Sequence, residues 1–217
     1  LTVNPSLYKL PYSVERDLQA VTLLAAAQYI LVVHPSVAAG TLKEFIALAK
    51  QKPGAFNYAS AGVGSPLHLA AELFKKRAGI SMVHLAYKGG GPAAAAVLAG
   101  EAQVLFASVA SSIPQVKAGR LKALAATGPQ RSKVAPELPT VAESGFPGFD
   151  VSSWYALLVP AGTAQSIVNA IRGAALKAVA MPDVQEAMAR QGLDVETSTP
   201  QELAVRIRSE TAVWAGV

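Results

Sequence analysis

One stretch of the sequence decides the fold: FNYASAGVGSPLHLA, residues 56–70. Its first part, Phe56 to Ala59, has the length and apolar character of a buried strand. A turn of small residues follows, and Ser65 then stands at the N-cap of a helix that begins with Pro66. A short strand that passes through a tight turn into a helix is typical of α/β units with a parallel sheet.

The same alternation continues on both sides of this stretch. Thr41 and Glu44 have the spacing of a capping box, and Pro53-Gly54 ends the helix that they begin. Further strands are expected at residues 30–33, 82–87, 104–106 and 121–126, and further helices at 66–77, 92–98 and 112–117. Together these elements predict a complete doubly wound α/β unit.

The composition changes after this unit. Residues 128–149 are rich in glycine and proline and are expected to form a connector with one short helix at 140–143. The remaining chain predicts a strand at 154–159, helices at 164–180, 182–190 and 200–214, and a second strand at 194–197. Such a helix-rich segment cannot close a core alone. It either adds helices to the one sheet or belongs to a second lobe whose other strands precede Leu1.

Composition also limits the chemistry. The chain has 217 residues, 52% of them hydrophobic and 15% charged, so it can bury a core. The absence of cysteine excludes disulfides and thiolate chemistry, and the three histidines, well separated in sequence, are a poor supply for a metal site or a catalytic triad. The net charge of +5 is scattered, which argues against a nucleic-acid partner. Mean hydropathy is +0.34, yet no window approaches the roughly 18 apolar residues of a membrane-spanning helix.

Three small-residue turns join predicted strands to predicted helices, at residues 60–66, 88–92 and 107–112. In open α/β sheets ligands bind at the carboxyl ends of strands, and the free N–H groups of a helix start attract anions. A helix start contributes about 0.3–1 kcal/mol and a hydrogen bond to a charged group about 1.5–3 kcal/mol. Several together reach the roughly −8 kcal/mol of micromolar affinity. The turns therefore predict an anion pocket that needs no catalytic residue.

Other classes of site fit less well. The chain has neither a P-loop nor the serine elbow of the α/β-hydrolases, and no motif supplies a base for Ser60 or Ser65. His68, in the first turn of its helix, is placed to donate a hydrogen bond to a carboxylate or to be satisfied locally, whereas His34 and His84 are expected to be structural. Trp154 is either a core residue or the wall of a cleft.

Six motifs in a fixed order carry a resemblance to a known family. They are NPSLY with LPY (4–8 and 10–12), LVVHPS (31–36), NYASAGVGSPLHLA (57–70), YKGGGPA (87–93), PELPTVAESG (136–145) and VPAGT (159–163). With these motifs the chain resembles the Bug family, the extracytoplasmic solute receptors of tripartite tricarboxylate transporters. The resemblance covers essentially the whole chain.

The resemblance implies a two-lobed α/β fold like that of periplasmic binding proteins, with doubly wound sheets. Lobe two would comprise residues 28–150, and residues 1–27 and 151–217 would be the remains of an incomplete lobe one. Family members carry an additional N-terminal portion with a signal peptide and the first strands of lobe one, which this sequence lacks. A periplasmic location is therefore expected.

The implied function is capture of a small organic carboxylate in the cleft between the lobes, followed by transfer to a membrane permease. No cofactor, metal or catalytic residue is implied. The effector-binding module of a transcription regulator, which can share this architecture, is the alternative. The implied ligand-binding residues are the carboxylate loop of lobe two, two further turns on the same edge, and a tryptophan near the lobe junction: Ser60, Ala61, Gly62, Gly64, Ser65, His68, Lys88, Gly89, Gly90, Gly91, Ser108 and Trp154.

Overall fold

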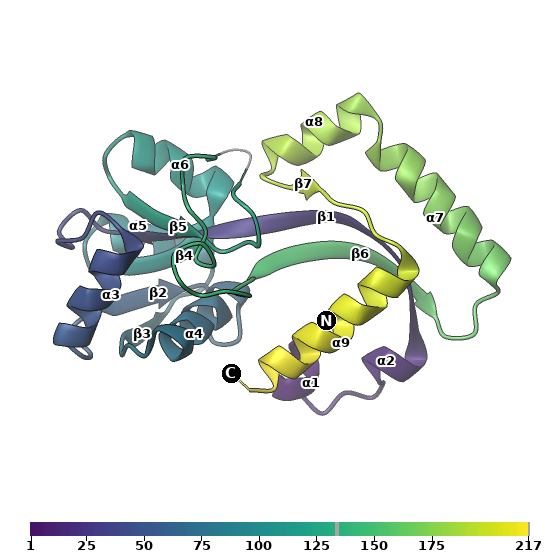
Figure 1. Ribbon diagram of the computed structural model, residues 1–217, viewed down its shortest axis with the longest axis horizontal. Coiled ribbons are helices and arrows are strands. Elements are labelled where there is room, and N and C mark those ends of the chain that lie inside the picture. Colours follow the sequence, from purple (N-terminus) through teal and green to yellow (C-terminus); the bar gives the residue numbers. More distant parts are fainter. Residues whose placement is uncertain (133–134, 217) are drawn as a thin grey trace. The chain divides into compact units, whose positions relative to one another are not determined.

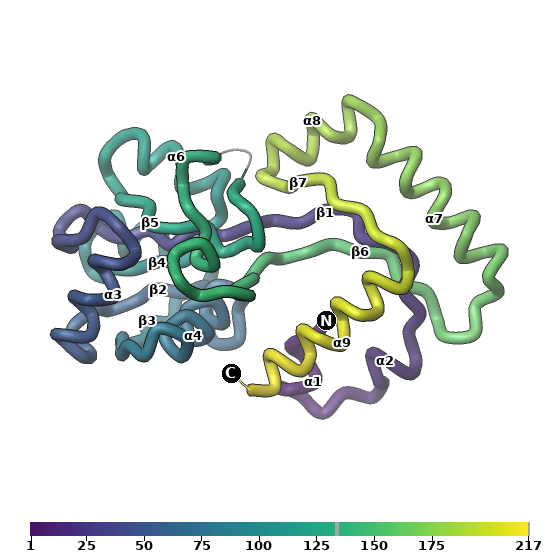
Figure 2. Tube along the Cα trace, in the orientation of Figure 1, coloured from purple at the N-terminus to yellow at the C-terminus, as the bar shows by residue number. Residues whose placement is uncertain are grey.

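The computed structural model describes residues 1–132 and 135–216 (Figures 1 and 2). Residues 133–134 of the predicted connector and the last residue of the predicted 151–217 range lie outside it. The chain divides into two compact units: a larger one, Ala27–Ser153, and a smaller one made of Leu1–Ala26 and Trp154–Val217. The chain passes between the units along two strands, β1 (Leu18–Val33) and β6 (Ser152–Pro160), which Figure 2 shows as continuous traces.

The sheet of the larger unit has the order β3-β2-β4-β1-β5. Its other strands are β2 (Asn57–Ser60), β3 (Val83–Ala86), β4 (Val104–Ser108) and β5 (Lys122–Ala126). β2 is parallel to β3 and β4, as predicted, whereas β1 is antiparallel to β4 and β5. The prediction of a parallel sheet is therefore wrong for β1. A fully buried strand is apolar on both faces, and this pattern carries no information about direction.

Helices cover both faces of this sheet: α3 (Leu42–Gln51), α4 (Pro66–Ala78), α5 (Gly90–Leu98) and α6 (Val109–Lys117). Successive residues of a strand point to opposite faces. Phe106 contacts Phe74 of α4, with ring centroids 5.8 Å apart, whereas Leu105 packs in a cluster with Val97 of α5. α4 and α5 therefore lie on opposite faces, which confirms the doubly wound arrangement.

Two local predictions in this unit differ from the structure. The predicted helix at 140–143 is wrong: these residues form a turn that follows an isolated bridge between Ala126 and Thr140. Thr140 and Glu143 exchange the two hydrogen bonds of a capping box, 2.8 and 3.0 Å, but Gly145 with its positive φ and Pro147 leave no room for a second helical turn. In the second case α6 begins at Val109 rather than at residue 112, because Ser108 is its N-cap.

The smaller unit is rich in helices, as predicted. They are α1 (Asn4–Leu7), α2 (Val14–Asp17), α7 (Gln165–Val179), α8 (Pro182–Arg190) and α9 (Pro200–Trp214). Both β6 and β7 (Asp194–Val195) pair with β1. A small apolar cluster, which includes Leu23, Leu203 and Ile207, forms its core. None of the helices within the described residues combines the length and apolarity that a membrane crossing requires.

Phe74 is expected to be a main contributor to the stability of the larger unit. Its fully buried ring meets those of Phe106, Phe146 and Phe149 at centroid distances of 5.8, 6.1 and 6.4 Å. Phe74→Ala should lower the free energy of unfolding by about 3–5 kcal/mol, because it opens a cavity among these rings. Urea unfolding measures the loss. Val205→Ala, at a 56% exposed position of α9, is the control and should stay within about 0.5 kcal/mol of the wild type.

Candidate functional site

The parallel strands of the larger unit bring the three predicted turns to one edge of the sheet. Ser60, the last residue of β2, pairs with Ala86 at the end of β3. Ala59 pairs with Leu105 of β4, so β4 ends at the same edge. The turns at residues 60–65 and 88–91 and the N-cap Ser108 therefore follow three neighbouring strands at a common edge (Figure 1). This edge is the candidate site.

The first turn, Ser60–Ser65, is held by hydrogen bonds of its own. The hydroxyl of Ser60, a fully buried residue, accepts a hydrogen bond from the Gly62 amide at 3.1 Å, and the Ser65 amide donates to the Gly62 carbonyl at 3.2 Å. Gly62 and Gly64 have φ values of 119° and 75°, in the region that favours glycine. We call this segment the carboxylate turn, after the ligand that the resemblance leads us to expect.

Each of the three turns leads into a helix start. Ser65 caps α4 by accepting from the His68 amide, Ser108 caps α6 by accepting from the Ser111 amide, both at 3.3 Å, and Gly89 is the N-cap of α5. Among the described residues, none accepts a hydrogen bond from the backbone N–H groups of Ala61, Gly90 or Ala110. Such groups, with the helix dipoles behind them, form a surface suited to an anion.

The remaining predicted residues of the edge are more exposed. Lys88, Gly90 and Gly91 are exposed, and Gly89 is half-buried. A side chain placed at Gly90 would meet Leu67 at 3.9 Å, so the second turn is near the start of α4. Within residues 1–132 and 135–216 no group of three or more histidine, aspartate or glutamate side chains is arranged to hold a metal ion.

Behind the carboxylate turn lies a cluster that the sequence reasoning did not assemble. We call it the imidazole cluster: Tyr58, His68, Glu72, Lys75 and His84. The His84 ring stacks on Tyr58 at 4.7 Å and lies 4.3 Å from His68. The Tyr58 hydroxyl donates to Glu72, which also binds the Lys75 ammonium at 2.7 Å. Two features of the sequence point to this cluster. His68, Glu72 and Lys75 are spaced along one face of α4, and Tyr58 and His84 pair in neighbouring parallel strands.

Burial and neighbouring charges shift the pKa values of this cluster. The pKa values of His68 and His84 are lowered, mainly because burial disfavours the charged imidazolium. Burial and the hydrogen bond to Glu72 raise the pKa of Tyr58. Burial alone would raise the pKa of Glu72, but the hydrogen bonds from Lys75 and Tyr58 outweigh it and lower that pKa. Both imidazoles therefore tend to be neutral.

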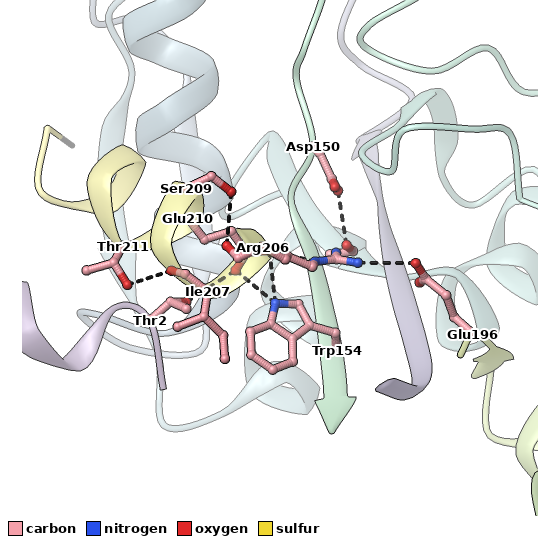
Figure 3. A network of polar contacts seen from close by, with 10 residues as sticks. Thr2, Asp150, Trp154, Glu196, Arg206, Ile207, Ser209, Glu210 and Thr211 are labelled. Atoms are coloured by element: carbon pink, nitrogen blue, oxygen red, sulfur yellow. Dashed lines mark hydrogen bonds and ion pairs between the residues drawn. The ribbon is translucent and has the colours of Figure 1, made fainter. Parts of the chain in front are cut away.

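Trp154 belongs to a polar network within the smaller unit (Figure 3). Its indole N–H donates to both carboxylate oxygens of Glu210, at 2.9 and 2.8 Å. Glu210 also accepts from Arg206 at 2.9 Å and from Thr2 at 3.2 Å. The Arg206 guanidinium lies 5.9 Å from the centre of the indole ring. These contacts give Trp154 a packing role, and its contact with a ligand stays a prediction.

The chain is similar to known proteins along its whole length. All 217 residues match the family described as "Tripartite tricarboxylate transporter family receptor". The chain is 35% identical over 207 residues to the "UPF0065 protein in tcbD-tcbE intergenic region" of Pseudomonas sp. strain P51, covering 95% of this chain and 62% of the relative. It is 34% identical to "Protein BugT" of Bordetella pertussis, covering all of this chain and 66% of BugT. The chain thus spans just under two thirds of the length of these curated relatives.

Solved structures show the same relationship. A TctC solute-binding protein from Polaromonas superposes with a TM-score of 0.88 at 27% identity, covering 99% of this chain and 73% of that one. MatC from Rhodopseudomonas palustris with bound malate gives 0.76 at 27% identity, covering 96% and 72%. The R. palustris protein Rpa4515 with adipate also gives 0.76 at 27% identity, covering 95% and 69%.

The fold and the similar structures place the chain among the solute-binding proteins of the periplasmic-binding type. Within that class, the chain belongs to the receptor family of the tripartite tricarboxylate transporters, which includes Bug proteins. The predicted family and fold class are confirmed. The prediction of a binding protein rather than an enzyme is also confirmed, because this is a family of receptors.

The Glu210 network is expected to stabilise the smaller unit. Glu210→Ala should lower the free energy of unfolding by about 1–3 kcal/mol, because it leaves the half-buried Trp154 N–H without a partner. Glu186→Ala is a matched control, since Glu186 also pairs with an arginine of its own helix, but with 72% of its side chain exposed. It should cost at most about 1 kcal/mol. Equal losses for the two variants in chemical unfolding would contradict the interpretation.

The imidazole cluster is expected to make stability depend on pH. In the unfolded chain both histidines return to a pKa near 6.5, whereas folding lowers it. Below pH 6.5 the unfolded chain therefore binds protons that the folded chain does not, and the stabilisation present at higher pH is lost as the pH falls. Thermal unfolding between pH 8 and 5.5 should show a falling midpoint. The double variant His68→Asn, His84→Gln should flatten this slope, and an unchanged slope would count against the cluster as its origin.

Proposed function

We propose that the protein captures a small organic carboxylate and delivers it to the membrane permease of a tripartite tricarboxylate transporter. One observation carries the proposal: the carboxyl ends of β3, β2 and β4 lie at one edge, and each leads into a helix start. The ligand's carboxylate accepts hydrogen bonds from the backbone of the carboxylate turn and of the Lys88–Gly91 turn. The Ser108 N-cap lies at the same edge and completes the predicted pocket.

The energetics are sufficient without a charged side chain. Each hydrogen bond from an N–H group to a carboxylate contributes about 1.5–3 kcal/mol, and each helix start adds about 0.3–1 kcal/mol. Three or four such contacts reach the roughly −8 kcal/mol that corresponds to a micromolar dissociation constant. Lys88 is exposed beside the turn and steers the anion toward it.

Two of the similar structures support a proposed ligand class. Adipate and malate, the acids named for two of the similar structures, are dicarboxylates of six and four carbons. We infer a dicarboxylate of this size, with one carboxylate on the carboxylate turn. The predicted ranges 28–150 and 1–27 with 151–217 are proposed as the two lobes, and the periplasm as the place where the receptor works. Trp154 is proposed as a second contact of the ligand.

Isothermal titration of the purified protein tests the ligand class. Succinate, malate and adipate should bind with micromolar dissociation constants, because each presents a carboxylate to the helix starts. Putrescine, a four-carbon diamine of opposite charge, is the matched control and should give no heat of binding. No heat of binding with any of the three acids, or equal binding of the diamine, would contradict the proposal.

Substitutions at Gly90 test the role of backbone N–H groups. Gly90→Pro removes the unpartnered N–H at the first position of α5, where the proline φ fits the helix. It should weaken binding of malate and adipate by about 10- to 100-fold, the equivalent of one hydrogen bond to a charged group. Gly90→Ala keeps the N–H and places its methyl in ordinary contact with Leu67, 3.9 Å away, so it should bind like the wild type. Equal affinities of the two variants for these acids would show that the Gly90 N–H does not contact the ligand.

A further inference from the structure

Two imidazole rings contact the carboxylate turn from behind, and the proposed binding of the anion by backbone groups uses neither. His68 comes from α4 and His84 from β3. The Gly64 amide donates to Nδ1 of His68 at 3.3 Å, and Nε2 of His84 lies 2.6 Å from the Ser60 hydroxyl. The two rings therefore reach the turn at two different points.

The contact with Gly64 fixes the protonation of His68. A backbone amide can only donate, so Nδ1 of His68 must offer a lone pair. A histidine whose Nδ1 is unprotonated is neutral and carries its proton on Nε2. Protonation of Nδ1 would set two donors against each other and break the contact with the turn.

The single proton of the Ser60 hydroxyl determines whether His84 donates or accepts in its contact with Ser60. The Ser60 hydroxyl has a single proton, which it donates to the Gly62 carbonyl at 3.2 Å, while it accepts from the Gly62 amide at 3.1 Å. Its remaining lone pair faces Nε2 of His84. All three contacts are hydrogen bonds only if Nε2 carries a proton and donates it to Ser60.

The other groups of the imidazole cluster leave both rings available for the turn. Tyr58 stacks on His84, and its hydroxyl donates to Glu72 rather than to a ring nitrogen. Glu72 is further occupied by Lys75, whose ammonium also lies 5.3 Å from the centre of the Tyr58 ring. The carboxylate and the ammonium thus satisfy each other, and the two ring contacts with the turn remain as described.

The turn depends on such external contacts because its glycines have little preference of their own. Gly62 and Gly64 adopt positive φ about as readily as negative φ, so each can leave the observed conformation at low cost. We infer that His68 and His84 are positioning residues of the carboxylate turn: each ring, in its Nε2–H tautomer, fixes one hydrogen bond that holds the backbone N–H groups toward the anion. The effect on affinity rests on the proposed function, whereas the effect on the turn does not.

Four variants separate positioning from packing. His68→Phe and His84→Phe keep a ring in each stack but lose the hydrogen bond. His68→Asn keeps an acceptor at the place of Nδ1, and His84→Gln keeps a donor at the place of Nε2. For malate and adipate, the phenylalanine variants should bind about tenfold more weakly and the amide variants within about threefold of the wild type. A packing role predicts the reverse order, and that result would overturn the inference.

Nuclear magnetic resonance tests the turn without a ligand. At pH 7.5 the ring nitrogens of both histidines should report the Nε2–H tautomer, and the Gly64 amide should exchange with solvent faster in His68→Phe but not in His68→Asn. A proton on Nδ1 of His68, or the same exchange in both variants, would overturn the inference. If the Gly64 amide exchanges faster in His68→Phe but the wild type binds none of the acids, the positioning role stands and the proposed function is rejected. Equal binding of the acids by all four variants would reject the positioning role alone.

Discussion

The site depends on the parallel register of β2 with its two neighbours. Ser60 pairs with Ala86, and Ala59 pairs with Leu105, so three strands end at one edge and three helices begin there. A single helix start attracts an anion by only about 0.3–1 kcal/mol. The register brings several helix starts to one edge, and under the proposed function their small contributions act on one ligand without a buried cationic side chain. In the proposed function, the net charge of +5 contributes to the approach of the anion rather than to its recognition.

A second requirement is a firm support for a turn that is rich in glycine. The fully buried Ser60 joins the turn to β3 through His84, and Gly64 joins it to α4 through His68. Exposed backbone N–H groups bind tightly only when their directions are fixed before the ligand arrives. In the inference drawn above, the imidazole cluster supplies this order through His68 and His84, and the proposed anion binds the backbone N–H groups of the turn.

Much of the fold could be predicted from the sequence because its signals are local. The N-caps Ser65 and Thr41 and the runs of apolar residues located most of the strands and helices of the larger unit. The direction of β1 could not be predicted, since a strand buried on both faces looks the same in either direction. Its first twelve residues, Leu18–Tyr29, were not predicted as a strand, because apolar and polar residues do not alternate there. A helix at Thr140 was predicted from a capping pattern that here closes a turn.

The candidate site could be predicted only in part. The turns and their common edge could be predicted, because the order of strand, turn and helix is visible as local patterns in the sequence. The imidazole cluster joins Tyr58, His68 and His84 across twenty-six residues and three elements, and its contacts depend on the register of β2 with β3. The partner of Trp154 is Glu210, 56 positions away, and no local pattern links them. Long-range pairing of polar groups is therefore the part that required the structure.

The continuity of β1 has a mechanical consequence. The boundary between the units falls after Ala26, inside this strand, where other multidomain chains place a loop. Ala25 and Ala26 pair with β7, and Tyr29 onward pairs with β4, so hydrogen bonds hold the strand on both sides of the boundary. The backbone of β1 therefore lacks, at this boundary, the freely turning dihedral angles of a loop linker. Three consecutive alanines, Ala25 to Ala27, stand at the boundary, so the chain crosses it as ordered strand with small side chains.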